Sequence, residues 1–183
     1  MSIKKNRFEV LINPTEEQVF EREPLMKFSF YLNSRHMVLI STLDEITENL
    51  DNGFSGFPSG VIDGSSIGHA SSLMWYWTLR AYEVIRTISQ AKDCFSSKFI
   101  EDVNDLKRDL SKARMPSAKM EKRGKREPVI STRSPDGWDY ENKDLLIGDP
   151  YDYISARKLL QKYDEIMTNL KPSDVLKRHE ESY

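Results

Sequence analysis

The residues best suited to chemistry lie along one predicted helix, residues 73–90, LMWYWTLRAYEVIRTISQ. A polar line with spacings of 4, 3, 4 and 3 runs along this helix: Tyr76, Arg80, Glu83, Thr87 and Gln90. Side chains three or four residues apart are neighbours on a helix, so Glu83 is within reach of both Arg80 and Arg86. A carboxylate between two guanidinium groups has three interpretations.

The first interpretation is structural, because buried charges are normally paired, and a buried Arg80–Glu83–Arg86 network would fix how the helices pack. The second is an anion or phosphate site, in which Arg80 and Arg86 act together with basic residues that follow in the chain. Those residues are Arg114, Lys119, Lys122 and Arg123. The third is an enzyme that uses Glu83 as a general acid or base, which requires a cleft and a shifted pKa.

A second chemical feature is the basic segment, residues 107–126, with nine Lys or Arg and two acidic residues. Such a run is an electrostatic footprint for nucleic acid or a nucleotide. It has no aromatic residue, whereas proteins that bind single strands usually place aromatic side chains among the basic ones. The alternative is a solvated loop that docks on the acidic part of its own fold or of a second copy.

The sequence contains no recognisable catalytic or metal motif. The glycine-rich residues 52–68 lack the Gly-Lys-Ser/Thr of a phosphate-binding loop. The histidines, His36, His69 and His179, are far apart, and the only cysteine, Cys94, follows Asp93, which disfavours a thiolate. We therefore expect no catalytic residue, no metal site and no cofactor, and a protein that is more readily explained as non-enzymatic.

The helix that carries the polar line is also the most apolar stretch of the chain. It has two Trp, two Tyr and no Gly or Pro, and Trp77, Ala81, Val84 and Ile88 form one apolar row. This composition is typical of a helix at the centre of a bundle. We expect Ser71 or Ser72 to cap it, Trp77 to be buried, and the glycine-rich residues 52–68 to be a long connection before it.

Three further helices are expected around the central one, over residues 25–50, 96–114 and from Ser155 to about residue 170, with Pro116 ending the third. Alternation in residues 7–13 indicates an extended arm. Apolar residues 129–132 and 145–147 flank a turn signal at 134–137, which predicts a small β-hairpin or a loop. The predicted fold class is mainly α, a four-helix antiparallel bundle with these two additions.

The domain organisation follows from these elements. We expect a single helical domain, 1–183, made of an N-terminal arm (1–24), helices one to three (25–114), a basic loop with the hairpin (115–151), and the last helix with a tail (152–183). Hydrophobic residues make up 38% of the chain and charged residues 31%, with a net charge of −2. No apolar run reaches the roughly 18 residues of a membrane span. These values predict a soluble, cytoplasmic protein without membrane contact.

The segments WTLRAYEVIRT and KFIEDVNDLKRDL resemble the antiparallel helices of HEPN-type domains, helical bundles found in bacterial defence and toxin systems. The resemblance covers about residues 25–170 and implies a bundle that pairs through its helices. Ribonucleases of this family carry an Arg, then about four to six other residues, and then a His on one helix. None of the three histidines here has that Arg, so the resemblance does not extend to the active site.

Taken together, the sequence predicts a non-enzymatic helical module that binds a protein partner or itself, in a defence or toxin-type system if the resemblance holds. The predicted surface is the glycine-rich loop with residues 116–150, because both are unusually long connections. The alternative is a nucleic-acid or nucleotide-binding protein that uses residues 107–126.

Overall fold

The computed structural model describes residues 12–121, 124, 127–129, 132 and 136–182. The described residues are mainly helical, as predicted, and contain one small antiparallel sheet. The helices are α1 (Glu16–Arg22), α2 (Leu25–Phe28), α3 (Phe30–Gly53), α4 (Gly64–Gln90), α5 (Ser97–Lys119) and α6 (Ala156–Thr168). The strands are β1 (Asp136–Asp139), β2 (Asp144–Asp149) and β3 (Asp152–Ser155), in the order β1-β2-β3. Short 3-10 turns cover Lys92–Cys94, Pro172–Asp174 and His179–Ser182.

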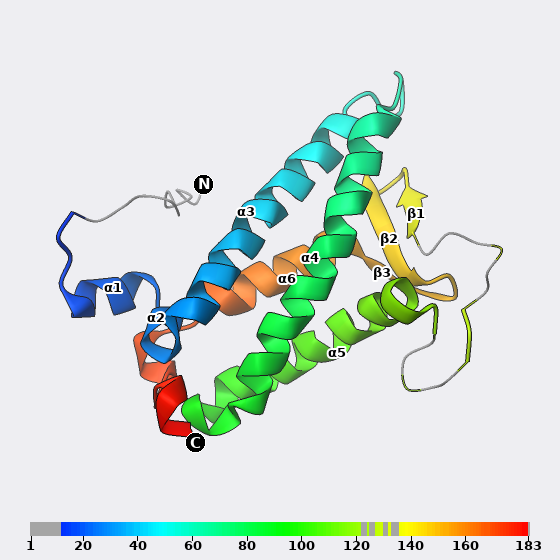
Figure 1. Ribbon diagram of the computed structural model, residues 1–183. Coiled ribbons are helices and arrows are strands. Elements are labelled where there is room, and N and C mark those ends of the chain that lie inside the picture. Colours follow the sequence, from blue (N-terminus) through cyan, green and yellow to red (C-terminus); the bar gives the residue numbers. More distant parts are fainter. Residues whose placement is uncertain (1–11, 122–123, 125–126, 130–131, 133–135, 183) are drawn as a thin grey trace.

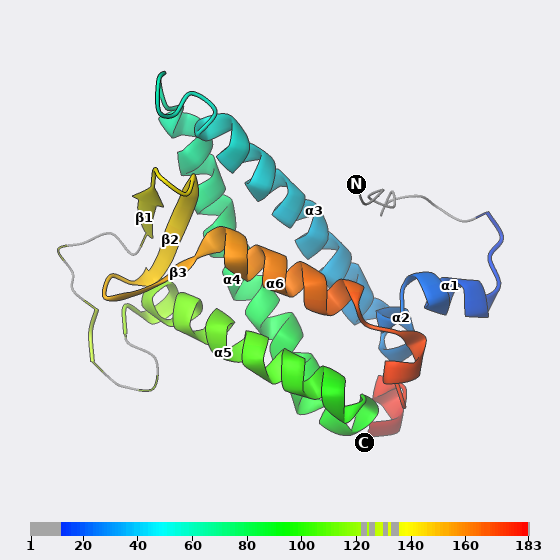
Figure 2. The same cartoon turned by 180° about the vertical axis from the view of Figure 1, so that it is seen from behind.

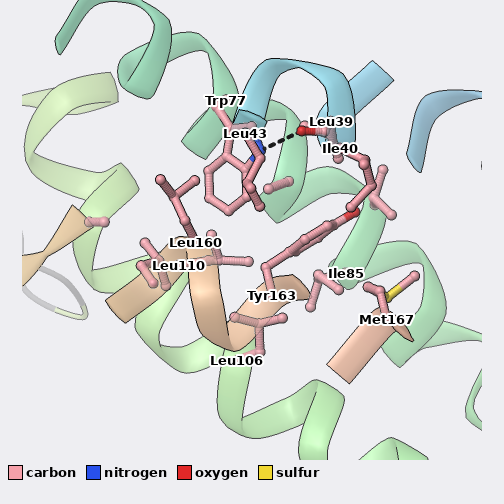
Figure 3. Close-up of a cluster of buried hydrophobic side chains, with 14 of the residues drawn as sticks. Leu39, Ile40, Leu43, Trp77, Ile85, Leu106, Leu110, Leu160, Tyr163 and Met167 are labelled. Atoms are coloured by element: carbon pink, nitrogen blue, oxygen red, sulfur yellow. Dashed lines mark hydrogen bonds between the residues drawn. The ribbon is translucent and has the colours of Figure 1, made fainter. Parts of the chain in front are cut away.

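Helices α3 and α4 form a long antiparallel pair (Figure 1). Trp77 on α4 is 1% exposed, which confirms that this side chain belongs to the core. Its indole Nε1 donates a hydrogen bond of 3.0 Å to the carbonyl of Leu39 on α3 (Figure 3). A buried tryptophan needs such a partner because its N–H loses water on folding. The burial predicted for Trp77 is therefore confirmed.

Helix α6 packs on the inner side of α4 through Tyr163, whose ring meets Trp77 edge-on at 5.2 Å between centroids (Figure 3). The Tyr163 hydroxyl is 3.0 Å from Nδ1 of His36 on α3. Tyr163 is fully buried, and the loss of water around its phenol raises the pKa of this group above its usual value. One aromatic pair thus joins α4 to α6, and a hydrogen bond ties α6 to α3.

The regular four-helix antiparallel bundle predicted from the sequence is not confirmed. Figures 1 and 2 show α4 and α5 diverging from the corner where they meet, and the sheet lies between the N-terminal half of α4 and the C-terminal half of α5. Strand β2 packs on both α5 and α6. Leu145 and Ile147 of β2 are buried, so the sheet contributes to the main core. The hydrophobic periodicity of a helix shows which of its faces is buried but not the angle at which it crosses its neighbours, so it could not predict this divergence.

Helix α4 begins earlier than predicted, at Gly64 rather than after Ser71 or Ser72. The Asp63 carboxylate accepts hydrogen bonds from the backbone N–H and the hydroxyl of both Ser65 and Ser66. These bonds lower the pKa of Asp63 to about 2. An N-cap of this kind starts a helix even in a glycine-rich segment. The connection before α4 is therefore shorter than the predicted 52–68 and covers residues 54–63.

Helix α5 continues through Pro116 to Lys119, so the prediction that Pro116 ends it was wrong. Proline has no N–H, which leaves the carbonyl of Lys112 without its usual helical donor. At this turn the backbone of Gly148 on β2 comes close, and a Cβ added to Gly148 would lie 3.5 Å from the Lys112 carbonyl oxygen. The sheet therefore packs against the turn that the proline alters.

The predicted hairpin exists, but its strands differ from the predicted ones. Residues 145–147 do lie in β2, whereas the partner strand is β1, Asp136–Asp139, in place of residues 129–132. Asp136 and Gly137, predicted as the turn, are in β1, and the turn is formed by residues 140–143 with Lys143 at φ +53°. Residues 130, 131 and 133–135 lie outside the described residues. A third strand, β3, was missed because Asp152–Ser155 is short and polar.

The first predicted helix, 25–50, is divided at Ser29 into α2 and α3, because the Ser29 backbone is extended and its hydroxyl caps α3. Helix α1 lies within the predicted N-terminal arm, 1–24, and has seven residues, with Thr15 and Gln18 forming a capping box. Of the predicted arm at 7–13, only Ile12 and Asn13 are described.

The start of the last helix was predicted correctly, with Ser155 as the cap of α6. Beyond α6 the chain returns to α2, where the Lys27 ammonium donates to the carbonyls of Pro172 and Val175. Cys94, at the corner between α4 and α5, is buried. Within the described part of the chain, no helix is both long and apolar enough to cross a membrane.

Candidate functional site

The polar line on α4 faces outward. Arg80, Glu83 and Arg86 are all exposed, and Nη1 of Arg86 lies 2.9 Å from Oε2 of Glu83. The first interpretation, a buried network, is therefore excluded, because this ion pair is on the surface and its side chains are about half exposed. Exposed pairs of this kind contribute little to stability. Glu83 is also not enclosed by two arginines, since its described ion pair is with Arg86 alone.

Four described basic residues of this segment, all on α5, make contacts within the fold. Lys107 donates to Ser89, Arg108 pairs with Asp105, and the Lys112 ammonium lies 3.0 Å from Asp152. Arg114 stacks on the ring of Tyr82 on α4, with its guanidinium carbon 4.7 Å from the ring centroid. These contacts explain why α5 is basic without invoking an external anion.

The remaining predicted anion-site residues are not gathered into one place by the described structure. Lys119 is exposed at the end of α5, and Arg114 stands beside α4 one helical turn from Arg86, since Tyr82 and Arg86 are four residues apart. Lys122 and Arg123 lie outside the described residues. The structure therefore adds no geometry that would select an anion.

A different surface joins the two long connections singled out in the sequence. Phe57 from the glycine-rich loop and Tyr140 from the β1–β2 turn have ring centroids 6.3 Å apart. Tyr140 also meets Trp138 of β1 and the buried Phe54 edge-on, each at 6.3 Å. We call the set of Phe57, which is partly buried, and the exposed Trp138 and Tyr140 the aromatic tip. Trp138 is 40% exposed and Tyr140 is 43% exposed.

The aromatic tip packs against the first turns of α4. A Cβ placed on Gly64 would lie 3.4 Å from the end of the Trp138 indole, so the indole lies close to the helix backbone. Asp136 at the start of β1 accepts a hydrogen bond of 2.6 Å from the Ser71 hydroxyl on α4. These contacts hold the hairpin against α4 and keep the three rings together at one end of the molecule.

Acidic side chains are the main charges close to the aromatic tip in sequence. Asp139 and Glu141 flank Tyr140, and Asp63 precedes Gly64. Hydrogen bonds from the Asn142 side chain and backbone lower the pKa of Asp139, so this carboxylate is charged at neutral pH. Lys143 follows in the turn, and the nearby Arg157 is paired with Asp51 at 2.7 Å. The tip is therefore aromatic with an acidic border.

A second exposed aromatic pair lies on the outer face of α4. Trp75 is 45% exposed and Tyr76 is 53% exposed, and their rings lie 5.0 Å apart. Leu79 and Arg80 follow one turn later on the same face. Large exposed aromatic residues in a cluster are typical of interaction surfaces.

Buried polar groups of the described residues have structural explanations. Asp144 is 4% exposed and accepts hydrogen bonds from the Leu145 and Arg157 amides and from the Ser155 hydroxyl, so it anchors the start of α6. No group of His, Cys, Asp or Glu within the described ranges is arranged to hold a metal ion.

The comparisons with known proteins give no relative, because no protein-family model, curated protein or solved structure matches this chain. The resemblance to HEPN-type domains accordingly stays a prediction. The aromatic tip itself was missed as a unit from sequence. Its signal was present in the alternation of Trp138 and Tyr140 and in the lone phenylalanines of the glycine-rich loop, but only the fold brings them together.

Proposed function

We propose that this protein is a non-enzymatic helical module that binds a protein partner through the aromatic tip. The observation that carries the proposal is that Phe57, Trp138 and Tyr140, from segments about 80 residues apart, form one partly exposed cluster on a supported base. Trp and Tyr at the centre of an interface typically supply most of its binding energy. The rings are held by Gly64 and Phe54, so little order is lost when a partner docks.

The aromatic and acidic side chains of the aromatic tip indicate which residue types a partner would present to it. Aromatic faces next to Asp139 and Glu141 suit a segment that offers apolar side chains together with Lys or Arg, since cations are attracted both to carboxylates and to aromatic faces. A partner of this kind is most simply a basic, partly apolar stretch of another protein. An association with a defence or toxin-type system, as the HEPN resemblance implies, would determine which protein supplies that stretch.

The test places a photo-crosslinking amino acid at position 140 of the full chain in its host cell. We expect a discrete protein adduct from position 140 and none from position 151, because Tyr151 is exposed but lies in the β2–β3 turn at the other end of the sheet. The adduct should disappear when Trp138→Ser is added. Adduct formation that is equal at both positions, or that persists with Trp138→Ser, contradicts the proposal.

A catalytic alternative has its own test. Robust turnover by the pure protein that is abolished by Glu83→Gln would replace the binding module with an enzyme. We expect no such activity, because Glu83 is exposed and paired with Arg86.

The alternative of nucleic-acid or nucleotide binding by residues 107–126 makes a separate prediction. Binding that rests on phosphate contacts weakens steeply with salt, and it should fall further with Lys119→Glu or with Lys122→Glu and Arg123→Glu together. We expect weak binding of a single-stranded RNA oligonucleotide, because Lys107, Arg108, Lys112 and Arg114 already have partners within the fold. Tight, salt-sensitive binding that these substitutions abolish would favour the alternative over the protein partner.

A further inference from the structure

Two arginines from different helices lie at one level along the line where α3 and α4 pack together. The two helices are antiparallel and lie side by side (Figure 1). The indole of Trp77 on α4 donates a hydrogen bond of 3.0 Å to the carbonyl of Leu39 on α3, and this contact fixes the level of one helix relative to the other. One helical turn from the contact, in the same direction along both helices, the chain carries Arg35 on α3 and Arg80 on α4. These two arginines therefore lie at the same level on neighbouring helices.

A second contact between α3 and α4 shows that both arginines lie toward the outer surface. Nε2 of His69 on α4 lies 3.2 Å from Oε1 of Glu45 on α3, and both side chains are about half exposed. Arg80 follows His69 by eleven residues, which is three turns and about 20° on a helix, so it belongs to the same row of side chains. Arg35 lies between the row of Glu45 and the row of Leu39, on the side of α3 next to α4. Both arginines are exposed.

Neither arginine has a carboxylate partner among the residues that the structure describes. The other arginines with a described ion pair each bind an aspartate or glutamate: Arg86, Arg108, Arg157 and Arg178. The acid nearest to Arg80 along α4 is Glu83, and its described ion pair is with Arg86 at 2.9 Å. No acidic residue lies within one turn of Arg35 on α3. Two positive charges at the same level repel each other, and an anion between them would remove the repulsion.

Exposed apolar side chains flank the two arginines. The Arg35 guanidinium carbon lies 4.4 Å from the centroid of the Tyr31 ring, and this stacking restricts the arginine before any ligand arrives. Tyr76 lies one turn from Arg80 and is 53% exposed, and Val38 on α3 is 50% exposed. Both immediately precede the two residues of the hydrogen bond between the helices, so they too lie at one level. A ligand that reaches both arginines therefore also meets an apolar and aromatic surface.

We propose that Arg35 and Arg80 together bind the phosphate group of a phosphorylated tyrosine on another protein. A phosphate monoester has about 1.5 to 2 negative charges at neutral pH and three acceptor oxygens, so it can accept hydrogen bonds from both guanidinium groups at once. A carboxylate has one negative charge and would leave a net positive charge at the site. The ring that carries the phosphate packs against Tyr76 and Val38. Arg35 was not predicted as an anion-site residue, because it lies on a different helix, far from Arg80 in the sequence.

The test is isothermal titration calorimetry of the full chain with N-acetyl-phosphotyrosine amide as the probe. We expect saturable binding that weakens at least about tenfold with Arg35→Gln and with Arg80→Gln, since each variant removes one of the two charged donors. N-acetyl-tyrosine amide, which lacks the phosphate, and inorganic phosphate, which lacks the ring, should both bind more weakly than the probe. Tyr76→Ser should weaken binding of the probe and leave binding of inorganic phosphate unchanged.

Two variants away from this site serve as controls. Lys119→Gln also removes one exposed positive charge and should leave the affinity for the probe unchanged. Trp138→Ser should do the same, because the acidic border of the aromatic tip repels phosphate, so failure of one site is distinguishable from failure of the other. Circular dichroism and the melting temperature of each variant check that the fold is intact.

Four results would overturn the proposal. They are the absence of saturable binding, an equal affinity for the probe without phosphate, an affinity that Arg35→Gln and Arg80→Gln leave intact, and an equal loss with Lys119→Gln. Tighter binding of adenosine monophosphate than of the phosphotyrosine probe would also contradict it, because the ligand would then be a nucleotide in place of a protein side chain.

Discussion

At the scale of single residues, Trp75 and Trp77 lie two positions apart on α4 and have opposite surroundings. Trp77 is 1% exposed and hydrogen-bonded to Leu39, whereas Trp75 is 45% exposed. The core therefore depends on one of the two indoles, although both belong to the same apolar stretch of sequence.

We expect Trp77→Ala to lower the free energy of unfolding by about 3–5 kcal/mol, since it leaves a large cavity and removes the hydrogen bond from the indole to the Leu39 carbonyl. Trp75→Ala should change it by less than about 0.5 kcal/mol, because exposed substitutions rarely matter. Urea unfolding at low protein concentration, where self-association does not contribute, measures both. Similar losses for the two variants would show that the outer face of α4 is part of the core.

Asp136 gives a prediction about pH. Burial of its carboxyl raises its pKa above 3.8, and the hydrogen bond from Ser71 offsets this only in part. An acid whose pKa is higher in the folded state lowers stability as pH rises through the pKa of the unfolded state, and the loss is complete above the folded pKa. Asp136→Asn should therefore raise the melting temperature at pH 7 and leave it unchanged below about pH 3.8. An equal effect at both pH values would indicate a cause other than ionisation.

At the scale of elements, the ends of the helices are determined by a few polar or glycine residues. Asp63 starts α4 within a glycine-rich segment, Ser29 separates α2 from α3, and Ser155 starts α6. Caps of this kind depend on a few neighbouring residues and can be recognised in a sequence, and the start of α6 at Ser155 was predicted. The Asp63 cap was missed because the surrounding glycines outweighed it in the sequence pattern.

Two glycines test how the elements pack. Gly148 has φ +101° and sits against the α5 backbone, so Gly148→Ala should destabilise the fold by at least about 1 kcal/mol. Gly68 lies inside α4 with open space around it, and Gly68→Ala should stabilise the fold by about 0.5–1 kcal/mol. Chemical denaturation compares the two. A neutral Gly148→Ala would mean that β2 is free to move away from α5.

At the scale of the whole molecule, periodicity predicted the mainly helical fold and the burial of Trp77. It did not predict the arrangement of the helices, because the wedge formed by the sheet between α4 and α5 depends on contacts such as Gly148 on Lys112, between distant segments. For a related reason, the sequence did not decide whether Arg80, Glu83 and Arg86 are buried or exposed. A polar line on an apolar helix fits either an interior network or an outer face, and only the position of α6 decides between them.

The candidate sites likewise depend on tertiary contacts that the sequence alone did not predict. Residues 52–68 and 116–150 were recognised in the sequence as long connections. The contact between them, through the rings of Phe57 and Tyr140, forms only in the tertiary structure. The aromatic tip and the outer face of α4 lie on separate surfaces.

The burial of Cys94 has a practical consequence. It is the only cysteine of the chain, and its sulfur lies in the corner between α4 and α5 with 1% of the residue exposed. A thiol introduced on the surface would react with maleimide reagents far faster than this one. Spin labels or fluorophores can thus be attached at a chosen surface position without first removing the native cysteine.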